Sequence, residues 1–539
     1  MSPEVKTTTG SPGLARAAGL VSALTLISRL LGLVREQVFA ALLGAGLQAD
    51  AFLIAFRIPN LLRDMFAEGA LSAAFVPTYA RALKESGRPE AHRLVSRLLT
   101  LLTAILGVLV AAGIVFAEPL VALLAPGFDD VPGKAELTVL LTRIMMPFLP
   151  LVSFAAVAMG MLNAEERFGT PAFSPAMFNV VAILWGLALW ALGFDPSHVA
   201  IGWAVGTLLG GLAQLAIQVP ALRQAGWRFV PQWAPGDPGI RRIAVLMAPA
   251  TVGLAAVQVN LFVNSIFASY EQGAVSWLLY AFRILYLPIG LFGVAVGTVA
   301  TSGLARRAAE DDMDGLRATL RQALSIITFL NVPATVGLMV LGVPIVRLLY
   351  ERGRFAAEPG NTEATAAALF FYSLGLVAYT SVKVLAPAFY ALGSPRVPLF
   401  ASALAVATNL AINLLGHERF GFRAVALGAS IGSLANALVL LAVLQTRLGG
   451  VLDREVWSRL GRILLATLVM APVAWLAWRG LERVVGTHGL LAQTLICLPP
   501  VGLGALAYGA AAALLGLPET RQLWRLFRGR QHAQAPANP

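Results

Sequence analysis

The sequence predicts an all-α polytopic membrane protein with 14 transmembrane helices: two parallel-repeated six-helix lobes followed by two C-terminal helices. Three observations lead to this fold class. The 539-residue chain is 58% hydrophobic and 13% charged, with a mean hydropathy of +0.76. Uncharged runs such as residues 98–117 are long enough to cross the hydrocarbon core, which requires about 20 apolar residues. A pattern near residue 57 also recurs near residue 283.

Short connections separate the apolar segments, so no soluble domain is inserted in the chain. The candidate spans cover residues 14–41, 48–80, 95–117, 136–162, 171–193, 199–222, 241–268, 274–304, 318–343, 364–391, 397–416, 422–446, 460–480 and 488–516. Transmembrane helices tolerate the glycines and prolines inside these segments, because neighbouring helices satisfy the freed backbone groups. The polar N-terminus and the arginines of the first segment are unlike a signal peptide.

The internal repeat rests on two matching pairs. The segment LIAFRIPNLL surrounds Arg57, and LYAFRILYLP surrounds Arg283, which follows 226 positions later. The same offset separates Arg81 from Arg307. Each copy begins on the same side of the membrane, so the repeat is parallel and a substrate site is expected between the halves. The expected domains are an N-terminal lobe (1–228), a C-terminal lobe (229–450), two additional helices (451–518) and a basic tail (519–539).

The net charge of +12 is spread over alternate connections. Residues 81–93, 223–242 and 447–462 are rich in lysine and arginine, whereas residues 118–136 carry few. The positive-inside rule therefore places both termini in the cytoplasm, and nucleic acid is not expected as a partner. Cys497 is the single cysteine and the five histidines lack ligand spacing, so neither a disulfide nor a metal site is expected.

Charged side chains interrupt the second candidate span, in RIPNLLRDMFAEGA (residues 57–70). On a continuous helix Asp50, Arg57, Asp64 and Glu68 fall within roughly 40° of one another and form one stripe. A charge at the bilayer centre costs at least about 2.5–3.5 kcal/mol, so the stripe is expected to face a protein interior or a water-filled cavity. The alternative is structural: Arg57 would form ion pairs with Asp50 or Asp64.

Arginines outnumber acids among these intramembrane charges. Arg29 and Arg35 lie in the first candidate span, Arg63 lies in the second, and Arg283 has no acid within one helical turn. This excess predicts a cationic cavity. Because arginine suits bidentate contact with phosphate or carboxylate, the expected substrate is anionic, such as a phosphate-bearing lipid.

Three segments carry a resemblance to a known family. SRLLGLVRE, GAGLQADAFLIAFRIPNLLRDMFAEGALSAAFVPTYA and APAFYALGSPRVP resemble the MurJ (MviN) lipid II flippases of the multidrug/oligosaccharidyl-lipid/polysaccharide (MOP) exporter superfamily. The resemblance covers nearly the whole chain. It implies transport, without enzymatic activity, of lipid II (undecaprenyl-diphosphate-MurNAc-pentapeptide-GlcNAc) from the cytoplasmic to the periplasmic leaflet of the bacterial inner membrane. It places the chain in peptidoglycan biosynthesis, cell wall biogenesis and cell-shape maintenance, as a monomer surrounded by membrane lipids and alongside cell-wall synthesis proteins.

The resemblance also implies roles for individual residues. The headgroup diphosphate would be bound by Arg29, Arg35, Arg63 and Arg283. The family's acidic position matches Asp50. From the charged stripe itself, we expect Asp50, Arg57, Asp64 and Glu68 to set the charge of the cavity and to gate it. The last two helices would form a groove for the lipid tail. In the second lobe Asn409 and Asn413 could supply oxygens to a cation or join helices, and Lys383 could line the lobe or be structural. No carboxylate accompanies the two asparagines in the seventh or eleventh span, which argues against a cation site there.

Two other classes of protein remain as alternatives. A cation-coupled exporter of drugs or of another polyprenyl-linked oligosaccharide would show a membrane carboxylate among aromatic residues and a less cationic cavity. A polytopic glycosyltransferase would need a catalytic carboxylate in a large external loop, where Asp129 and Asp130 are the only acidic pair. No cofactor is expected. Alternating access would be driven by a monovalent cation or by the membrane potential, which supplies about 2.3 kcal/mol per charge per 100 mV.

Overall fold

The computed structural model describes residues 12–64 and 70–520, with the side chains of 12–18, 70 and 249–257 left out. These described residues form helices and connections, without a β-strand. Ten of the helices are long and apolar enough to cross a membrane, and a pair bent by 42° (Asn361–Ser373 and Leu376–Ala391) would be an eleventh span. The expected spans 14–41, 48–80 and 241–268 each include residues outside this description, so the count of 14 stays a prediction.

The first of two compact units comprises Met1–Val275 and Arg352–Glu358. Its helices are α1 (Pro12–Leu43), α2 (Leu47–Arg63), α3 (Ala70–Glu85), α4 (Gly87–Val115), α5 (Ala117–Leu124), η2 (Pro126–Phe128), α6 (Lys134–Met145), α7 (Phe148–Ala164), α8 (Gly169–Leu192), α9 (Pro196–Ala216), α10 (Val219–Gln224), α11 (Pro238–Ser269) and α16 (Gly353–Ala357).

Aspartates cap two helices of the first unit. Asp195 accepts hydrogen bonds from two backbone N–H groups of α9, and Asp237 does the same for α11. In both helices a proline follows the cap, where its missing N–H costs nothing and its fixed φ favours the first turn. Gly193 ends α8 in the left-handed conformation (φ 67°), which a side chain would disfavour.

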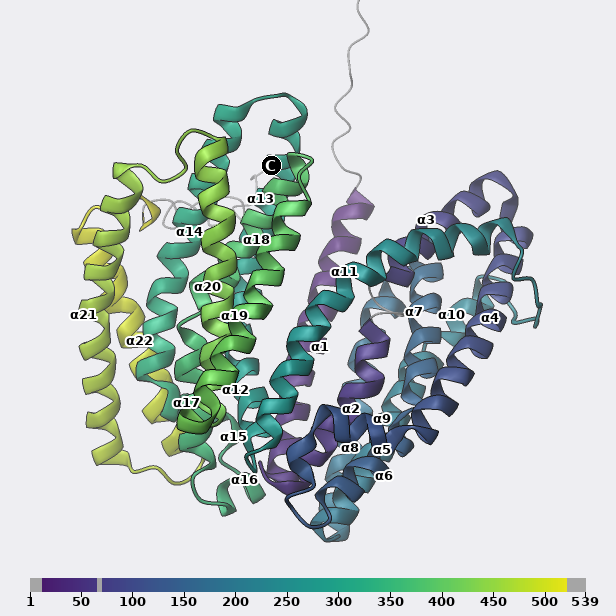
Figure 1. Ribbon diagram of the computed structural model, residues 1–539, viewed down its shortest axis with the longest axis horizontal. Coiled ribbons are helices and arrows are strands. Elements are labelled where there is room, and N and C mark those ends of the chain that lie inside the picture. The colour runs from purple at the N-terminus through teal and green to yellow at the C-terminus, as the bar shows by residue number, and fades with distance from the viewer. Residues whose placement is uncertain (1–11, 65–69, 521–539) are drawn as a thin grey trace, which may run out of the picture. The chain divides into compact units, whose positions relative to one another are not determined.

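The helix α11 belongs to the first unit, although the sequence repeat assigns it to the second lobe. It packs along α3 and contacts α4 and α5 (Figure 1). Ile240 and Ile243 of α11 enter the apolar core formed by α3, α4, α7 and α10. The boundary expected at residue 228 therefore differs from the compact units, which divide after Val275.

The second unit comprises Ser276–Glu351 and Pro359–Pro539. Its helices are α12 (Ala274–Pro288), the π-helical η3 (Ile289–Val294), α13 (Ala295–Ala309), α14 (Met313–Val340), α15 (Gly342–Tyr350), α17 (Asn361–Ser373), α18 (Leu376–Ala391), α19 (Arg396–Phe420), α20 (Phe422–Arg447), α21 (Arg454–Val485) and α22 (Leu490–Leu514).

Two glycines let the middle of this unit pack closely. A Cβ on Gly293 would lie 2.9 Å from Thr380 Cγ2, and one on Gly297 would lie 3.0 Å from the carbonyl oxygen of Lys383. The π-helical turn of η3 falls in the segment PIGLFGVAVG, where glycine and proline weaken regular helix geometry.

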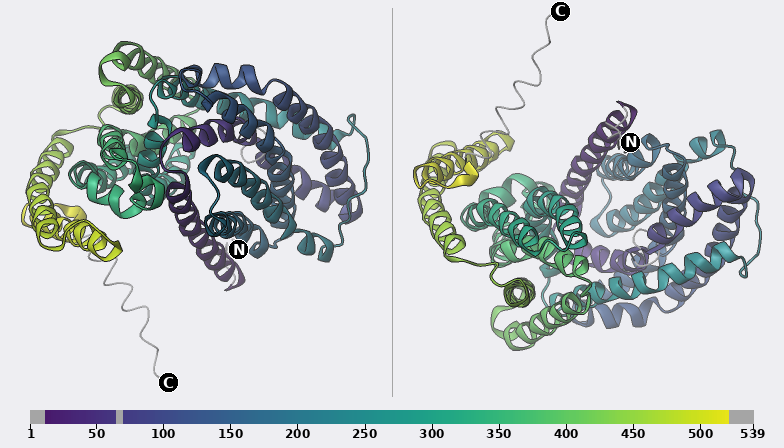
Figure 2. Two further views of the ribbon diagram at one scale, coloured as in Figure 1. Left: turned by 90° about the horizontal axis from the view of Figure 1, so that it is seen from below. Right: turned by 90° about the horizontal axis from the view of Figure 1, so that it is seen from above.

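The last two helices form an adjacent pair within the second unit (Figure 2). In that unit α21 packs against α14, and α22 packs against α15. Phe329, Met470 and Tyr508 join these helices in one apolar cluster. The expected separate segment 451–518 is thus continuous in packing with the rest of the unit.

Candidate functional site

The first two expected headgroup arginines lie on α1. Arg29 is exposed and makes no hydrogen bond or ion pair with the described residues. Arg35 is partly buried: its guanidinium carbon lies 5.2 Å from the ring centroid of Phe178 on α8, and Nη2 lies 3.5 Å from Glu36 Oε1. Asn179, also on α8, donates a 3.1 Å hydrogen bond to a backbone carbonyl of α1. The helix α8 therefore holds α1 in place along the segment that carries both arginines.

Arg57 connects α2 to α11. Its guanidinium donates hydrogen bonds to the Ser265 hydroxyl and, at 3.2 Å, to the carbonyl oxygen of Leu261. Ser265 Oγ in turn donates to the same carbonyl at 2.7 Å. These bonds restrict where the guanidinium points, because one planar donor group meets two acceptors a helical turn apart.

Arg63 and Asp64 form an ion pair where α2 ends. Arg63 Nη2 lies 2.8 Å from Asp64 Oδ1, and Gln258 Nε2 on α11 lies 3.4 Å from Asp64 Oδ2. The Asp64 carboxylate is therefore partnered by Arg63 and Gln258, and the expected alternative pair with Arg57 is wrong. Asp64 is a member of the charged stripe that the sequence predicts on this helix. Glu68, the last member of that stripe, lies outside the described residues.

Asp50 is fully buried and has a partner that the sequence analysis missed. Its Oδ2 accepts hydrogen bonds from Lys134 Nζ (2.9 Å) on α6 and from the Gly273 backbone N–H (2.8 Å), and both charged side chains are 0% exposed. Lys134 Nζ also lies 4.1 Å from the ring centroid of Phe128. The structure thus places Asp50 in a buried contact with Lys134 and the Gly273 backbone, away from open space. The sequence contains a signal for this pair. A buried carboxylate needs a nearby cation, and Lys134 directly precedes an apolar segment.

In the second unit two expected cations lie on different helices. Arg283 is exposed on α12, one residue before the buried Ile284. Lys383 is exposed on α18, and its amine makes no hydrogen bond or ion pair with the described residues. Both helices belong to one compact unit.

Asn409 and Asn413 lie buried on α19, facing α20. Asn413 Nδ2 lies 3.3 Å from Asn409 Oδ1, and a Cβ added to Gly428 of α20 would come within 2.5 Å of Asn409 Oδ1. The asparagines therefore occupy a close helix–helix contact that requires a glycine on the facing helix. Among the described residues, no group of three or more His, Cys, Asp or Glu side chains could hold a metal ion.

An apolar groove of about 800 Å³ lies between α12, α14, α21 and α22 of the second unit. None of the described residues that line it carries a charge. The hydroxyl of Tyr508 in its wall is satisfied by a 2.7 Å hydrogen bond to the carbonyl oxygen of Phe329. Ile284 and Leu287 of α12 also line the groove. Ile284 directly follows Arg283 in the chain. Such a groove suits a long hydrocarbon chain, because its wall presents little that needs water.

Comparison with known proteins identifies the family. A family model described as lipid II flippase MurJ matches residues 39–496. The chain belongs to this family. A probable lipid II flippase MurJ of Vibrio cholerae is 34% identical over 526 residues, covering 94% of this chain and 97% of the relative. A probable MurJ of Rhizobium meliloti is 35% identical, with coverage of 94% and 95%. The lipid II flippase MurJ of Burkholderia cenocepacia is 35% identical, with coverage of 80% and 84%.

Solved structures also resemble this chain in fold. A lipid II flippase MurJ in an inward closed conformation aligns with a TM-score of 0.76 at 26% identity, covering 94% of this chain and 100% of that chain. An inward-facing MATE multidrug transporter of the MOP superfamily aligns with a TM-score of 0.65 at 17% identity, covering 80% and 98%. The second likeness shows the fold alone. The expected family is confirmed, and MurJ membership favours a lipid transporter over the drug-exporter and glycosyltransferase alternatives.

Proposed function

We propose that the chain moves lipid II from the cytoplasmic to the periplasmic leaflet of the bacterial inner membrane and so supplies peptidoglycan synthesis. The observation that carries this proposal is the position of Arg283 on α12, immediately before Ile284 in the wall of the apolar groove. A cation beside an uncharged groove fits an anionic head joined to a long apolar tail. Membership in the MurJ family supports the identity of that amphiphile.

In this proposal the diphosphate is neutralised by Arg29, Arg35, Arg63 and Arg283, and the undecaprenyl tail lies along α21 and α22. Only the polar head then needs a route through the membrane. Arg57 and Asp64 adjust the charge met by the head; Asp50, buried against Lys134, acts by holding α2 to α6. Nothing in this scheme requires bond making or breaking, so the protein acts as a transporter and not as an enzyme.

The proposed cycle is alternating access by rocking of the two lobes. The π-helical η3, which directly follows α12, supplies a place where that helix can bend. Either the membrane potential or a monovalent cation would bias the cycle, without a cofactor. Imposing a potassium diffusion potential, or a sodium gradient, on vesicles that contain the pure protein distinguishes the two energy sources.

We further propose that both termini are cytoplasmic and that the protein acts as a monomer beside cell-wall synthesis proteins. The lysine- and arginine-rich connections support this orientation. Labelling single cysteines placed in alternate connections with an impermeant maleimide, in a Cys497→Ser background, tests the orientation. Labelling of the connection at residues 81–93 from outside intact cells would reverse it.

The central experiment is complementation of a bacterium depleted of its own lipid II flippase, with lipid II translocation measured in the same cells. We expect the wild-type chain to restore growth and translocation, and Arg29→Ala, Arg63→Ala and Arg283→Ala to restore neither at equal membrane expression. Arg81→Ala is the matched control, because Arg81 is 53% exposed and forms its ion pair with Glu85 one turn away. Expressed wild-type protein that leaves translocation at the depleted level would overturn the substrate assignment.

A further inference from the structure

A polar pocket of about 230 Å³ lies in the second unit where α14, the start of α21 and the segment after α22 meet. Its charged lining consists of Arg321, Asp453, Glu455, Arg459 and Glu519. Three carboxylates and two guanidiniums leave the lining with an excess of one negative charge. The pocket is thus polar and acidic, in contrast to the apolar groove of the same unit.

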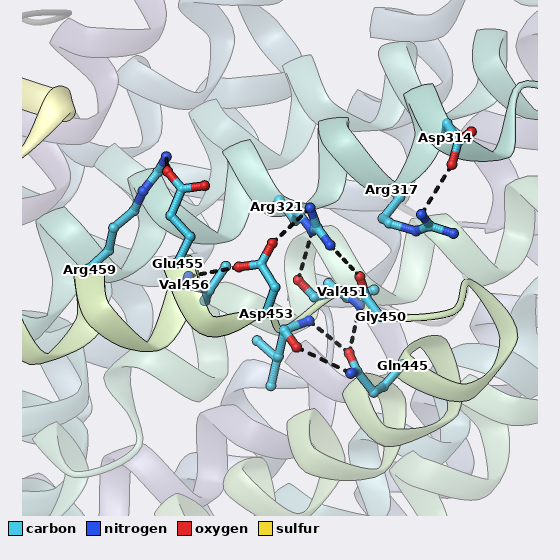
Figure 3. A network of polar contacts seen from close by, with 11 residues as sticks. Asp314, Arg317, Arg321, Gln445, Gly450, Val451, Asp453, Glu455, Val456 and Arg459 are labelled. Carbon is cyan, nitrogen blue, oxygen red and sulfur yellow. Dashed lines mark hydrogen bonds and ion pairs between the residues drawn. The ribbon is translucent and has the colours of Figure 1, made fainter.

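Arg321 forms hydrogen bonds and an ion pair with the segment beside the pocket (Figure 3). Nη1 lies 2.9 Å from Asp453 Oδ2, Nη2 donates to the Gly450 carbonyl at 2.6 Å, and Nε donates to the Val451 carbonyl at 3.1 Å. All three nitrogens of the guanidinium are therefore in use. Arg459, the second arginine of the lining, pairs with Glu455 Oε1 through Nη2 and lies 3.7 Å from Glu519 Oε1 through Nη1, whereas its Nε makes no such contact with the described residues.

Glu519 is a pocket residue whose carboxylate can accept a further hydrogen bond. Its side chain is only 6% exposed, and its Oε1 accepts a hydrogen bond from the Ser325 hydroxyl and lies 3.7 Å from Arg459 Nη1. Its second oxygen, Oε2, is buried and has no hydrogen-bond partner among the described residues. A buried carboxylate oxygen normally has a donor, because leaving it without one is costly. A cationic hydrogen-bond donor would meet this need.

The polar pocket adjoins the apolar groove at two points. Ser325 lines the pocket, and Phe329, one turn further along α14, lines the groove. One turn of helix advances by about 5.4 Å, so these linings are contiguous. After α22, Glu519 lines the pocket and the next residue, Thr520, lines the groove. A ligand that enters both cavities would have a polar end and an apolar chain.

We propose that this pocket binds the headgroup of an aminophospholipid, with its ammonium at the Glu519 carboxylate and one acyl chain in the adjoining end of the groove. The ammonium supplies the donor that Glu519 lacks, and Arg459 provides a cation for the lipid phosphate. The basic connections beside the pocket, which include Arg447 and Arg454, place it at the proposed cytoplasmic surface. The site concerns a lipid of the membrane itself, so it does not depend on the transported substrate.

The test is native mass spectrometry of the full chain with three probe lipids of identical acyl chains: phosphatidylethanolamine, phosphatidylcholine and phosphatidylglycerol. We expect wild-type protein to retain phosphatidylethanolamine at least threefold over the other two. Glu519→Gln should abolish this preference, because the amide is neutral and cannot pair with an ammonium. The matched control is Glu85→Gln, since Glu85 is 57% exposed and belongs to the other unit; it should keep the preference.

A second measurement needs only wild-type protein, so it can be made even if the Glu519→Gln variant does not fold. Stepwise N-methylation of phosphatidylethanolamine removes hydrogen-bond donors while it keeps the positive charge, and retention should fall with each methyl group. Equal retention of the three headgroups by the wild type, or a preference that persists in Glu519→Gln, overturns the proposal. Retention that responds to sodium ions and not to the headgroup also overturns it, because the carboxylate would then bind a metal cation.

Discussion

Lys134 Nζ lies 2.9 Å from Asp50 Oδ2, and neither side chain is exposed to solvent. The pair joins the start of α6 to the first turn of α2, and the backbone N–H of Gly273 adds a second contact to the same carboxylate oxygen. A buried pair of this kind can contribute little net stability, yet each partner depends on the other to remain charged inside the protein.

Removing the cation of this pair should destabilise the first unit strongly. Lys134→Met leaves the Asp50 carboxylate buried without its ion partner, which typically costs about 3–5 kcal/mol. The expected result is a large fall in the unfolding temperature of the purified protein in detergent, measured by tryptophan fluorescence. The double variant Asp50→Asn/Lys134→Met should recover part of the loss, because it removes the uncompensated charge. Lys84→Met, at an exposed position, is the control and should unfold like wild type; equal unfolding of Lys134→Met and wild type would exclude a stabilising role.

Replacing a proposed headgroup arginine and replacing Arg57 should have different effects on translocation and on the unfolding temperature. Arg29→Ala removes an exposed guanidinium that makes no hydrogen bond or ion pair with the described residues, so we expect translocation to fall with little change in unfolding temperature. A hydrogen bond to a charged group is worth about 1.5–3 kcal/mol, which corresponds to roughly a tenfold to hundredfold loss. Arg57→Ala should lower both quantities, because it also breaks the bonds to Ser265 and Leu261 on α11.

Rates of lipid II translocation in vesicles, paired with unfolding temperatures of the same preparations, measure this difference. Arg29→Lys should recover more activity than Arg29→Ala, since it restores the charge without the bidentate geometry. Full activity of both Arg29→Ala and Arg283→Ala would show that these cations do not handle the substrate.

The helices follow from local signals that are legible in the sequence. Apolar length predicts the spans, and an aspartate followed by proline, as at Asp195 and Asp237, marks where helices begin. The repeat around Arg57 and Arg283 also relates α2 to α12. These features could be predicted because each depends on residues close together in the chain or on a repeated pattern.

The contacts that define the site depend on which helices become neighbours. Helical phase places Asp50 on a face of α2, but it contains no information that α6 lies opposite, so Lys134 was missed. The repeat assigns α11 to the second lobe, whereas Ile240 and Ile243 pack into the first unit. Helical phase likewise did not predict that Gln258 of α11 lies beside Asp64.

Asp453 should make the stability of the second unit depend on pH in the acidic range. The backbone N–H of Val456, with the charge of Arg321 as a further cause, holds the pKa of the Asp453 carboxyl below its ordinary value of 3.8. A lowered pKa in the folded protein means that this stabilisation is present above the ordinary pKa and is lost as pH falls through the lowered value. Asp453→Ala should therefore lower the unfolding temperature at neutral pH, with a difference from wild type that shrinks in strong acid. A difference that stays constant down to the acid unfolding of the wild type would contradict the role of the charged carboxylate.

The apolar groove offers a test that separates binding of the tail from handling of the head. Ala334 of α14 lines the groove and is partly exposed, so Ala334→Trp would fill space that the tail needs. Because the added ring occupies a cavity of about 800 Å³, the fold should accept it, and the unfolding temperature should stay close to that of wild type. Lipid II translocation should fall at least several-fold, whereas a water-soluble headgroup analogue without the undecaprenyl chain should bind as it does to wild type. Val469→Trp is the matched control, since Val469 is 50% exposed on α21 outside the groove lining. If Ala334→Trp transports at the wild-type rate, the tail does not bind in the groove. The position of Arg283 next to the groove would then no longer support the proposed substrate.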